Sequence, residues 1–313
     1  MILDIVRGSC VDGPGLRTVI FLKGCPLKCV WCHNPESQSP SPQMVYYRHK
    51  CTHCGRCSRI CPNGAIDLEQ PNIINKQICS VCGECAQHCD SLALKRLGER
   101  YSDTQLLEIA LRDQSFYATS DGGVTFSGGE PLLHIDFLAH TANKFKRAGL
   151  HIAVETCGYF DFHEFKHKML PWVDLILFDI KLIDPEQHKH FTGKSNRLIL
   201  ENFKRLCFEK NVEIRPRVPL VPGITTTHQN LRQTAALFSE SGIIQYDMLP
   251  YNSSAQDKLK LLGLPFPAEL PLAPLPLAAE MQLRKKFEQY IGNQEHMFCN
   301  SKYAPIPVRS QST

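Results

Sequence analysis

The chain has 313 residues, with 35 Lys and Arg against 31 Asp and Glu, so its formal net charge is +4. This small excess of positive charge does not favour a nucleic-acid or membrane-surface partner. Hydrophobic residues make up 43% of the sequence and charged residues 21%, which is typical of globular proteins and excludes extensive disorder. The length suits one large α/β domain and one small domain.

Cysteine is the unusual part of the composition, with 15 residues. The segment from Met1 to Arg7 lacks the basic and apolar regions of a signal peptide. No uncharged apolar stretch approaches the roughly 20 residues that span a bilayer. We therefore expect a cytoplasmic protein with no membrane partner, in which cysteines stay reduced and clustered ones bind metal.

Eleven cysteines fall into three groups: Cys25, Cys29 and Cys32; Cys51, Cys54, Cys57 and Cys61; and Cys79, Cys82, Cys85 and Cys89. The second and third groups share the spacing C-x2-C-x2-C-x3-C, which is typical of bacterial proteins with two [4Fe–4S] clusters. The fourth cysteine of each run then binds the other cluster. The spacing predicts one cluster on Cys51, Cys54, Cys57 and Cys89 and a second on Cys61, Cys79, Cys82 and Cys85. Zinc sites are the alternative, but they usually split their ligands into two distant pairs.

The first group has only three cysteines. A [4Fe–4S] cluster held by three thiolates has one iron without a protein ligand, and that iron can bind a substrate or cofactor, as an open catalytic metal site does. The apolar residues 18–22 predict a buried parallel strand just before this group. Its C-terminal end is where α/β barrels place their chemistry. The alternative is a chance trio, because cysteine is often a small buried hydrophobe.

Alternating apolar and helical patterns predict six parallel strands, at residues 18–22, 124–126, 151–155, 174–180, 212–218 and 243–249. Because six units are too few for a closed eight-stranded barrel, we expect an α/β fold with an open, partial (β/α)6 TIM-like barrel.

Helical signals support this fold. A capping-box pattern at Ser102–Gln105 predicts a helix start, and residues 136–147 predict a second helix. The proline-rich residues 265–276 cannot form a helix. Residues 278–291, including Met281 and Phe287, predict a terminal amphipathic helix that packs on the barrel.

Five motifs together resemble the radical S-adenosylmethionine enzymes that activate glycyl radical enzymes, the pyruvate formate-lyase activase-like family. They are Asp12–Thr18 (DGPGLRT), Phe21–Cys25 (FLKGC), Trp31–Glu36 (WCHNPE), Ser127–Pro131 (SGGEP) and Leu249–Tyr251 (LPY). The resemblance covers about residues 1–250. The cysteine-rich region resembles the ferredoxin-like insert of the subgroup whose partners are eliminases, decarboxylases and C–C-adding enzymes.

The domain organisation follows from this resemblance. We expect a ferredoxin-like domain with two [4Fe–4S] clusters at residues 45–95, inserted into a radical S-adenosylmethionine partial barrel made of residues 1–44 and 96–313. The tail from about residue 253 resembles the family only loosely.

The resemblance implies reductive cleavage of S-adenosylmethionine to a 5′-deoxyadenosyl radical, which abstracts a Cα hydrogen from a glycine of the partner enzyme. Cys25, Cys29 and Cys32 are then the catalytic residues. Three [4Fe–4S] clusters and S-adenosylmethionine are the expected cofactors, and flavodoxin or ferredoxin is the expected electron donor. Two alternatives are a radical enzyme that acts on a small molecule and a non-catalytic iron–sulfur electron carrier.

The resemblance also implies cofactor contacts at Trp31, His33, Asn34, Gly128, Gly129, Glu130, Glu155, Thr156, Asp179, Ile180, Lys181, Arg217 and Asn252. Residues 128–130 are expected at the amino group of S-adenosylmethionine, Trp31 at its adenine and Arg217 near its carboxylate. Glu155, Thr156 and Asp179 fall where the simplest family member binds a monovalent cation, although that member has Asp at the position of Glu155. Asn252 replaces a common His and cannot titrate near neutral pH.

Taken without the resemblance, several of these residues have structural interpretations. Gly128 and Gly129 could form an ordinary turn, Thr156 could cap a helix and Trp31 could pack in the core. Asp179 and Lys181 could be a surface ion pair. The single cysteines Cys10, Cys157, Cys207 and Cys299 are interpreted as buried or incidental.

Overall fold

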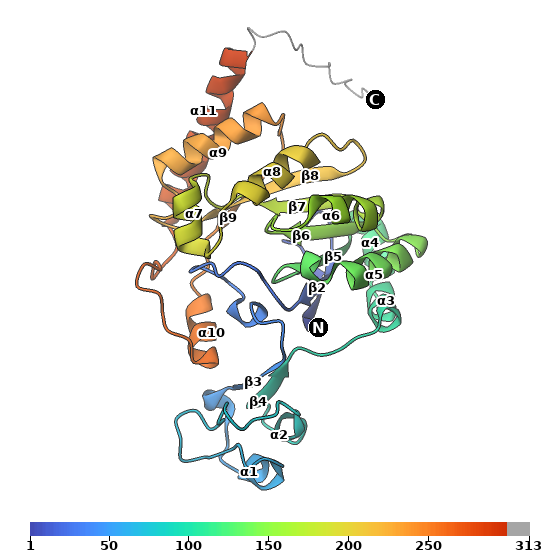
Figure 1. Ribbon diagram of the computed structural model, residues 1–313, viewed down its shortest axis with the longest axis vertical. Helices are drawn as coiled ribbons and strands as arrows, with labels where there is room; N and C mark the ends of the chain where they lie inside the picture. The colour runs from blue at the N-terminus through green and yellow to red at the C-terminus, as the bar shows by residue number, and fades with distance from the viewer. Residues whose placement is uncertain (299–313) are drawn as a thin grey trace.

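The structure, a computed structural model, describes residues 1–298 of the chain. Its centre is a curled seven-stranded sheet with the order β1-β2-β5-β6-β7-β8-β9 (Figure 1). The strands are β1 (Ile2–Ser9), β2 (Arg17–Leu22), β5 (Gly123–Gly128), β6 (Ile152–Thr156), β7 (Leu175–Asp179), β8 (Glu213–Leu220) and β9 (Asp247–Pro250). β2 and the five strands after it are parallel, and β1 pairs antiparallel with β2. The predicted α/β fold with six parallel strands is confirmed as a half-barrel.

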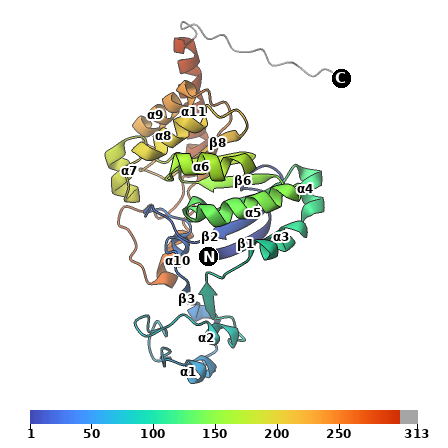
Figure 2. The ribbon, with the colours of Figure 1, turned by 45° about the vertical axis from the view of Figure 1, so that its right-hand side comes forward.

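Helices cover the convex side of this sheet (Figures 1 and 2). They are α3 (Asp103–Leu111), α4 (Gln114–Ser120), α5 (Ile135–Arg147), α6 (Phe162–Lys168), α7 (Pro185–Thr192), α8 (Arg197–Leu206), α9 (His228–Glu240) and α11 (Leu277–Phe298). Successive side chains of a strand point to opposite faces. Phe126 and Phe178 therefore lie in the main core, with Phe203 of α8. Their strand neighbours Ser127 and Asp179 point to the concave side.

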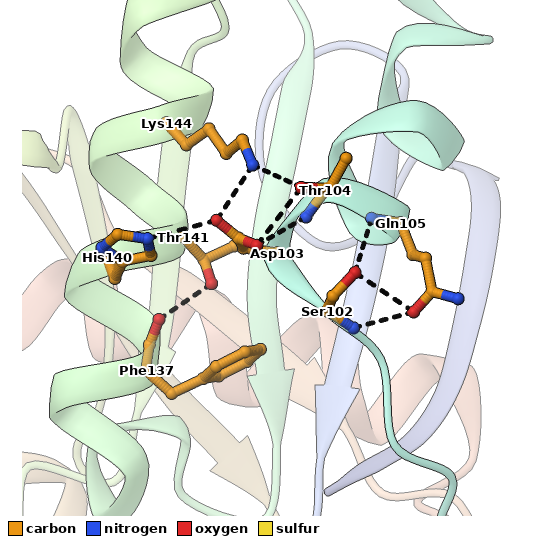
Figure 3. A network of polar contacts seen from close by, with 8 residues as sticks. All are labelled: Ser102, Asp103, Thr104, Gln105, Phe137, His140, Thr141 and Lys144. Carbon is orange, nitrogen blue, oxygen red and sulfur yellow. Dashed lines mark hydrogen bonds and ion pairs between the residues drawn. The ribbon is translucent and has the colours of Figure 1, made fainter.

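The start of α3 confirms the predicted capping box. The backbone N–H of Gln105 donates to Ser102 Oγ (3.2 Å), and the backbone N–H of Ser102 donates to Gln105 Oε1 (2.8 Å; Figure 3). In the same turn, Asp103 forms an ion pair with Lys144 of α5 at 3.1 Å and lies 3.3 Å from the ring of His140. The first turn thus both starts α3 and attaches it to α5.

A small separate lobe interrupts the barrel between β2 and α3, at the bottom of Figure 1. Its stem is an antiparallel pair, β3 (Gln43–Tyr46) and β4 (Leu94–Leu97), and it contains two short helices, α1 (Arg56–Ile60) and α2 (Glu84–Gln87). We call residues 43–97 the cysteine lobe. It has its own small core, which includes Ile66, Ile73 and Leu94.

Several elements differ from the sequence-based expectation. β1 was not predicted, because it is an edge strand with a largely exposed pattern. Residues 243–246, predicted as strand, are not paired, and β9 begins only at Asp247, where pairing with β8 starts. A further helix, α10 (Ala255–Leu262), precedes the proline-rich segment, which is non-helical as predicted.

The terminal helix α11 packs on α9, and Phe287 is buried against Phe238 and Tyr246, as predicted. Met281 was expected on the buried face but is 52% exposed. Cys299 lies outside the described residues. Within residues 1–298, no helix is both long and apolar enough to cross a membrane.

We expect Phe203→Ala to lower the free energy of unfolding by about 3–5 kcal/mol, because it opens a cavity in a fully packed core. The Phe203 ring is fully buried between Phe178 and Phe238. Phe208→Ala is the matched control, since this ring is 84% exposed, and we expect a change within about 0.5 kcal/mol. Anaerobic denaturant titration measures both, and equal losses would contradict this packing.

Candidate active site

The loop that carries Cys25, Cys29 and Cys32 leaves β2 at the carboxyl ends of the parallel strands, as predicted. Two backbone hydrogen bonds close its base: Gly24 N–H donates to the carbonyl of Ser37 (2.6 Å), and Cys25 N–H donates to the carbonyl of Gln38 (3.1 Å). The three cysteines therefore belong to one loop with fixed ends.

The end of α7 holds the middle of the same loop. Lys28 N–H donates to the carbonyl of Thr192 (2.7 Å), and Val30 N–H donates to the carbonyl of Phe191 (3.0 Å). Trp31 is buried beside Phe191, with ring centroids 6.2 Å apart, and packs with Leu182 and Tyr251. Its packing role is thus visible in the structure, and it links the cysteine loop to the motif that contains Tyr251.

The thiols of this loop lie in an environment that penalises bare thiolates. Burial raises the pKa of Cys32 to about 11 and also raises the pKa of Cys29. A hydrogen bond with the thiol of Cys157 lowers the pKa of Cys25 and raises that of Cys157. Three thiols close enough to affect one another, next to the Lys181 ammonium, are a donor set that suits a cationic iron centre held by three cysteines.

Two ion pairs lie on the concave side, at the ends of neighbouring strands. Lys181 Nζ is 2.7 Å from Asp179 Oδ2, and Arg217 Nη1 is 3.0 Å from Glu155 Oε1. Ser127 Oγ donates to the other oxygen of Glu155 (2.6 Å). Burial alone would lower the pKa of Lys181, but the negative charge of Asp179 and its hydrogen bond raise it, so the amine stays charged. The four residues of the two ion pairs were predicted as cofactor contacts, and the structure brings them together.

Arg217 has unused donors. Only 5% of the residue is exposed, and within residues 1–298 its Nε and Nη1 have no hydrogen-bond partner. The contact of Nη1 with Glu155 is thus an ion pair without hydrogen-bond geometry. An unpaired buried donor is costly, so these atoms are suited to an incoming anionic acceptor.

The Gly-Gly-Glu motif connects β5 to its neighbours. A Cβ on Gly128 would lie 2.2 Å from the carbonyl oxygen of Leu22, and one on Gly129 would lie 2.1 Å from that of Gly24. Gly128 also has a φ of +121°, which glycine adopts readily. The glycines therefore let β5 approach the base of the cysteine loop. A close approach of the backbone to a ligand was expected at this motif. In the structure, the backbone of Gly128 and Gly129 closely approaches the backbone of Leu22 and Gly24.

The Glu130 side chain is fully buried and directed inward. Its carboxylate accepts from the Thr156 hydroxyl (2.9 Å to each oxygen), from Cys157 N–H (2.7 Å) and from Leu132 N–H (3.1 Å). Burial raises its pKa. Glu130 and Thr156 thus join the ends of β5 and β6, and their side chains are already satisfied by the chain. The side chain of Ile180 is also directed away, into the main core.

His33, Asn34 and Asn252 meet outside the concave face, where the chain after β9 returns. We call residues 251–276, which include α10, the C-terminal strap. His33 Nε2 lies 2.9 Å from Ser254 Oγ, and Ser254 N–H donates to Asn252 Oδ1 (2.9 Å). Asn252 therefore organises the start of α10 through its amide oxygen.

Six cysteines of the lobe lie in or against its small core. Cys51, Cys54, Cys57 and Cys89 line one small enclosed cavity. Cys85 lies within electrostatic reach of Cys61, Cys79 and Cys82 of its own predicted set, and also of Cys57 of the other set. Within residues 1–298, no three His, Cys, Asp or Glu side chains are arranged around a single metal ion.

Three residues at the site were missed by the sequence analysis. Ser127 contacts Glu155, Cys157 contacts Cys25 and Glu130, and Lys258 of α10 binds the segment after Cys32. Cys157 directly follows Thr156, so its position at a strand end was the available signal. Among the other single cysteines, which were interpreted as buried or incidental, Cys10 is exposed and Cys207 is half-buried.

Comparison with known proteins agrees with this geometry. A family model described as "4Fe-4S single cluster domain" matches residues 11–200. The trans-4-hydroxy-L-proline dehydratase activating enzyme of Clostridioides difficile is 38% identical over 82% of this chain and 86% of its own length. The isethionate sulfite-lyase activating enzyme of Nitratidesulfovibrio vulgaris is 38% identical over 90% of this chain and 92% of its own length.

A solved structure, Streptococcus suis SuiB bound to precursor peptide SuiA, is similar in fold. It aligns with 91% of this chain and 47% of its own, with a TM-score of 0.53 and 11% identity. At that identity the likeness concerns the fold alone. With relatives of 38% identity along most of the sequence, the chain belongs to the family of radical S-adenosylmethionine enzymes that activate glycyl radical enzymes.

Proposed function

We propose that this chain activates a partner glycyl radical enzyme in the cytoplasm. The observation that carries the proposal is the three-cysteine loop at the carboxyl ends of the parallel strands, with the Asp179–Lys181 and Glu155–Arg217 pairs beside it. The named relatives support it, because they activate a dehydratase, a sulfite-lyase, a choline lyase and benzylsuccinate synthase. We propose that the partner of this chain is also a glycyl radical enzyme of this kind.

Cys25, Cys29 and Cys32 would hold the reacting [4Fe–4S] cluster. When bound, this cluster and S-adenosylmethionine supply a 5′-deoxyadenosyl radical that removes a Cα hydrogen from the partner's glycine. The pKa of Lys181 is raised, so its ammonium stays charged and would interact favourably with the thiolates and with the cofactor carboxylate. The free Nε and Nη1 donors of Arg217 suit that carboxylate, and Asp179 suits the cofactor's amino group.

Residues 128–130 act through the backbone in this proposal, since the Glu130 carboxylate already has four hydrogen-bond contacts from the chain. Trp31 is placed to support the adenine side of the site while remaining packed against Tyr251. His33, Asn34 and Asn252 would border the cofactor from the strap side. Ile180 would contribute only its backbone, because its side chain lies in the core.

The residues do not fit a monovalent cation. Glu155 already contacts Arg217 with one oxygen and Ser127 with the other. The Thr156 hydroxyl donates to Glu130 and accepts from Gly158 N–H (3.0 Å). In this chain the Arg217 guanidinium supplies a positive charge beside Glu155, so we propose no bound cation there.

We propose that residues 45–95 are a ferredoxin-like domain inserted into a radical S-adenosylmethionine partial barrel of residues 1–44 and 96–313. The cavity lined by Cys51, Cys54, Cys57 and Cys89 supports one further [4Fe–4S] cluster, and the Cys61, Cys79, Cys82 and Cys85 set supports another. With the first group this makes three clusters. Both lobe clusters would relay electrons from flavodoxin or ferredoxin to the barrel.

Electron paramagnetic resonance tests the proposed function directly. The reconstituted, reduced protein is mixed anaerobically with S-adenosylmethionine and, separately, with each glycyl radical enzyme that the relatives activate. We expect a glycine-centred doublet with one of these enzymes and none in its absence. Deoxyadenosine formation without a protein radical in any mixture would contradict a glycyl radical partner of these types.

Cys29→Ala separates the barrel cluster from the lobe clusters. We expect it to lose about a third of the bound iron, because the two lobe clusters have their own ligands, and to lose all cleavage of S-adenosylmethionine. Iron analysis and chromatography of 5′-deoxyadenosine measure these effects. Cys207→Ala, a half-buried cysteine outside the three groups, is the control. Persistent cleavage in Cys29→Ala would rule out this assignment.

Arg217→Lys tests the carboxylate contact. Lysine keeps the charge but lacks the fork of donors, so we expect the KM for S-adenosylmethionine to rise about 10- to 100-fold, the equivalent of one charge-assisted hydrogen bond. Arg215→Lys is the matched control, because Arg215 lies on the same strand and pairs with Glu213. An unchanged KM in Arg217→Lys would remove Arg217 from the cofactor site.

A further inference from the structure

Lys258 of α10 contacts three of the four residues that follow the third cysteine of the barrel loop. Its Nζ donates to the backbone carbonyl of His33 (2.9 Å) and to Asn34 Oδ1 (2.7 Å), and forms an ion pair with Glu36 Oε1 at 2.9 Å. An ammonium has three N–H donors, and three oxygens surround this one. More than 220 positions along the sequence separate Lys258 from these partners.

The contact completes the attachment of the cysteine loop. The base of the loop is closed by the bonds of Gly24 and Cys25, and its middle is bound to the end of α7. Segment 33–36, between Cys32 and the closing residue Ser37, has Lys258 as its link to the C-terminal strap, together with the contact between His33 and Ser254. Loss of Lys258 would leave the exit of the loop held by Lys23, whose Nζ donates to the carbonyl of Glu36, by the contact between His33 and Ser254, and by the closing residues Ser37 and Gln38.

The electrostatics of the segment also depend on this lysine. Glu36 is largely buried, and within residues 1–298 its Oε2 has no hydrogen-bond partner. Its other oxygen has Lys258 as its cationic partner. Removing one member of a buried pair leaves an uncompensated charge, which destabilises the local structure more than loss of the pair as a whole.

α10 is itself held by the cysteine lobe. Lys76 Nζ donates to the carbonyl of Leu262 at the end of α10 (2.5 Å), and Leu262 packs against Val45 and Leu97 of the lobe stem. Figure 1 shows α10 beside β3, between the barrel and the lobe. A cavity of about 870 Å³ separates these parts and is lined by Asn34, Glu36 and Lys258, among others. Lys258 therefore connects an element fixed by the lobe to the loop of the reacting cluster.

We propose that Lys258 is a positioning residue for the radical reaction: it fixes segment 33–36 and thereby the position of Cys32 and the orientation of the barrel cluster. This role rests on the proposed function, because it matters for catalysis only if the loop holds the reacting cluster. Lys258 acts through the loop and does not touch the reacting atoms. Because Lys258 belongs to α10, the geometry of the cluster loop depends on how the C-terminal strap packs against the cysteine lobe.

The test compares Lys258→Met with two other variants in the anaerobically reconstituted protein. Lys258→Arg keeps the charge, but its planar guanidinium cannot meet three oxygens arranged around one nitrogen. Lys260→Met is the matched control, because Lys260 lies on the same helix, is 78% exposed and pairs only loosely with Asp257 at 3.6 Å. The readouts are amide hydrogen exchange of residues 33–38, the electron paramagnetic resonance spectrum with S-adenosylmethionine, and KM and kcat for its cleavage.

For Lys258→Met we expect amide exchange of residues 33–38 to rise about tenfold or more. We also expect an altered cluster spectrum and a KM for S-adenosylmethionine about 10- to 100-fold higher, the range seen when residues that orient metal ligands are removed. Lys258→Arg should recover part of both effects, and Lys260→Met should match the wild type. Wild-type exchange and wild-type KM in Lys258→Met would overturn the proposal.

A second variant covers the case in which Lys258→Met does not fold. Glu36→Gln/Lys258→Met removes both charges of the pair, so that neither of the two is left without the other. We expect it to fold and still to show raised exchange at residues 33–38, and unchanged exchange would overturn the proposal. If the wild type did not cleave S-adenosylmethionine, the proposed function would fail, whereas the exchange experiment would still decide what Lys258 holds.

Discussion

Charged and thiol groups that are withdrawn from water need partners, and this requirement organises the carboxyl end of the half-barrel. Lys181 and Arg217 are almost fully buried. Lys181, which follows β7, contacts Asp179 at the end of that strand, and Arg217 of β8 reaches across β7 to Glu155 of β6. The pKa of the Cys29 and Cys32 thiols is raised by burial, so an apo-protein keeps them protonated. A bound iron cluster would compensate their charge, as metal binding does for deprotonated ligands in general.

The Gly-Gly-Glu motif has two structural roles, and the second follows from the need of a buried carboxylate for hydrogen-bond partners. Its glycines allow β5 to approach the base of the cysteine loop, and its glutamate joins β5 to β6 through Thr156 and Cys157. A buried carboxylate with several donors around it rigidifies the ends of both strands. The motif thus positions the cysteine loop, whether or not its backbone also contacts a cofactor.

Three parts of the chain that are distant in sequence hold the cysteine loop in place. The loop contacts β5 at its base, α7 in its middle and α10 at its exit. α10 in turn packs on the stem of the cysteine lobe. A cluster held in such a loop would have its ligands oriented by three separate elements, which is how proteins commonly fix the geometry of a metal site.

Much of this protein could be predicted from short sequence patterns, because the residues that form them are close together in the chain. The spacing of Cys51–Cys61 and Cys79–Cys89 predicts two sets of four cysteines. In bacterial proteins with two clusters, three closely spaced cysteines of each run bind one cluster and the fourth binds the other. The Ser102–Gln105 cap and the apolar strands could be read because their signals lie within a few residues. Alternation along a strand also explains why Ile180 faces the core while Asp179 faces the site.

Only the tertiary structure decided which polar groups use one another as partners. The inward direction of Glu130, the pairing of Arg217 with Glu155 and the binding of segment 33–36 by Lys258 join residues 26 to 225 positions apart. β1 and α10 also escaped prediction, because each is stabilised by packing at an edge of the barrel rather than by a strong pattern of its own. The sequence alone thus predicted the candidate ligands and determined most of the parallel strands, and the fold determined how the chain holds them in place, since such contacts have no local signal.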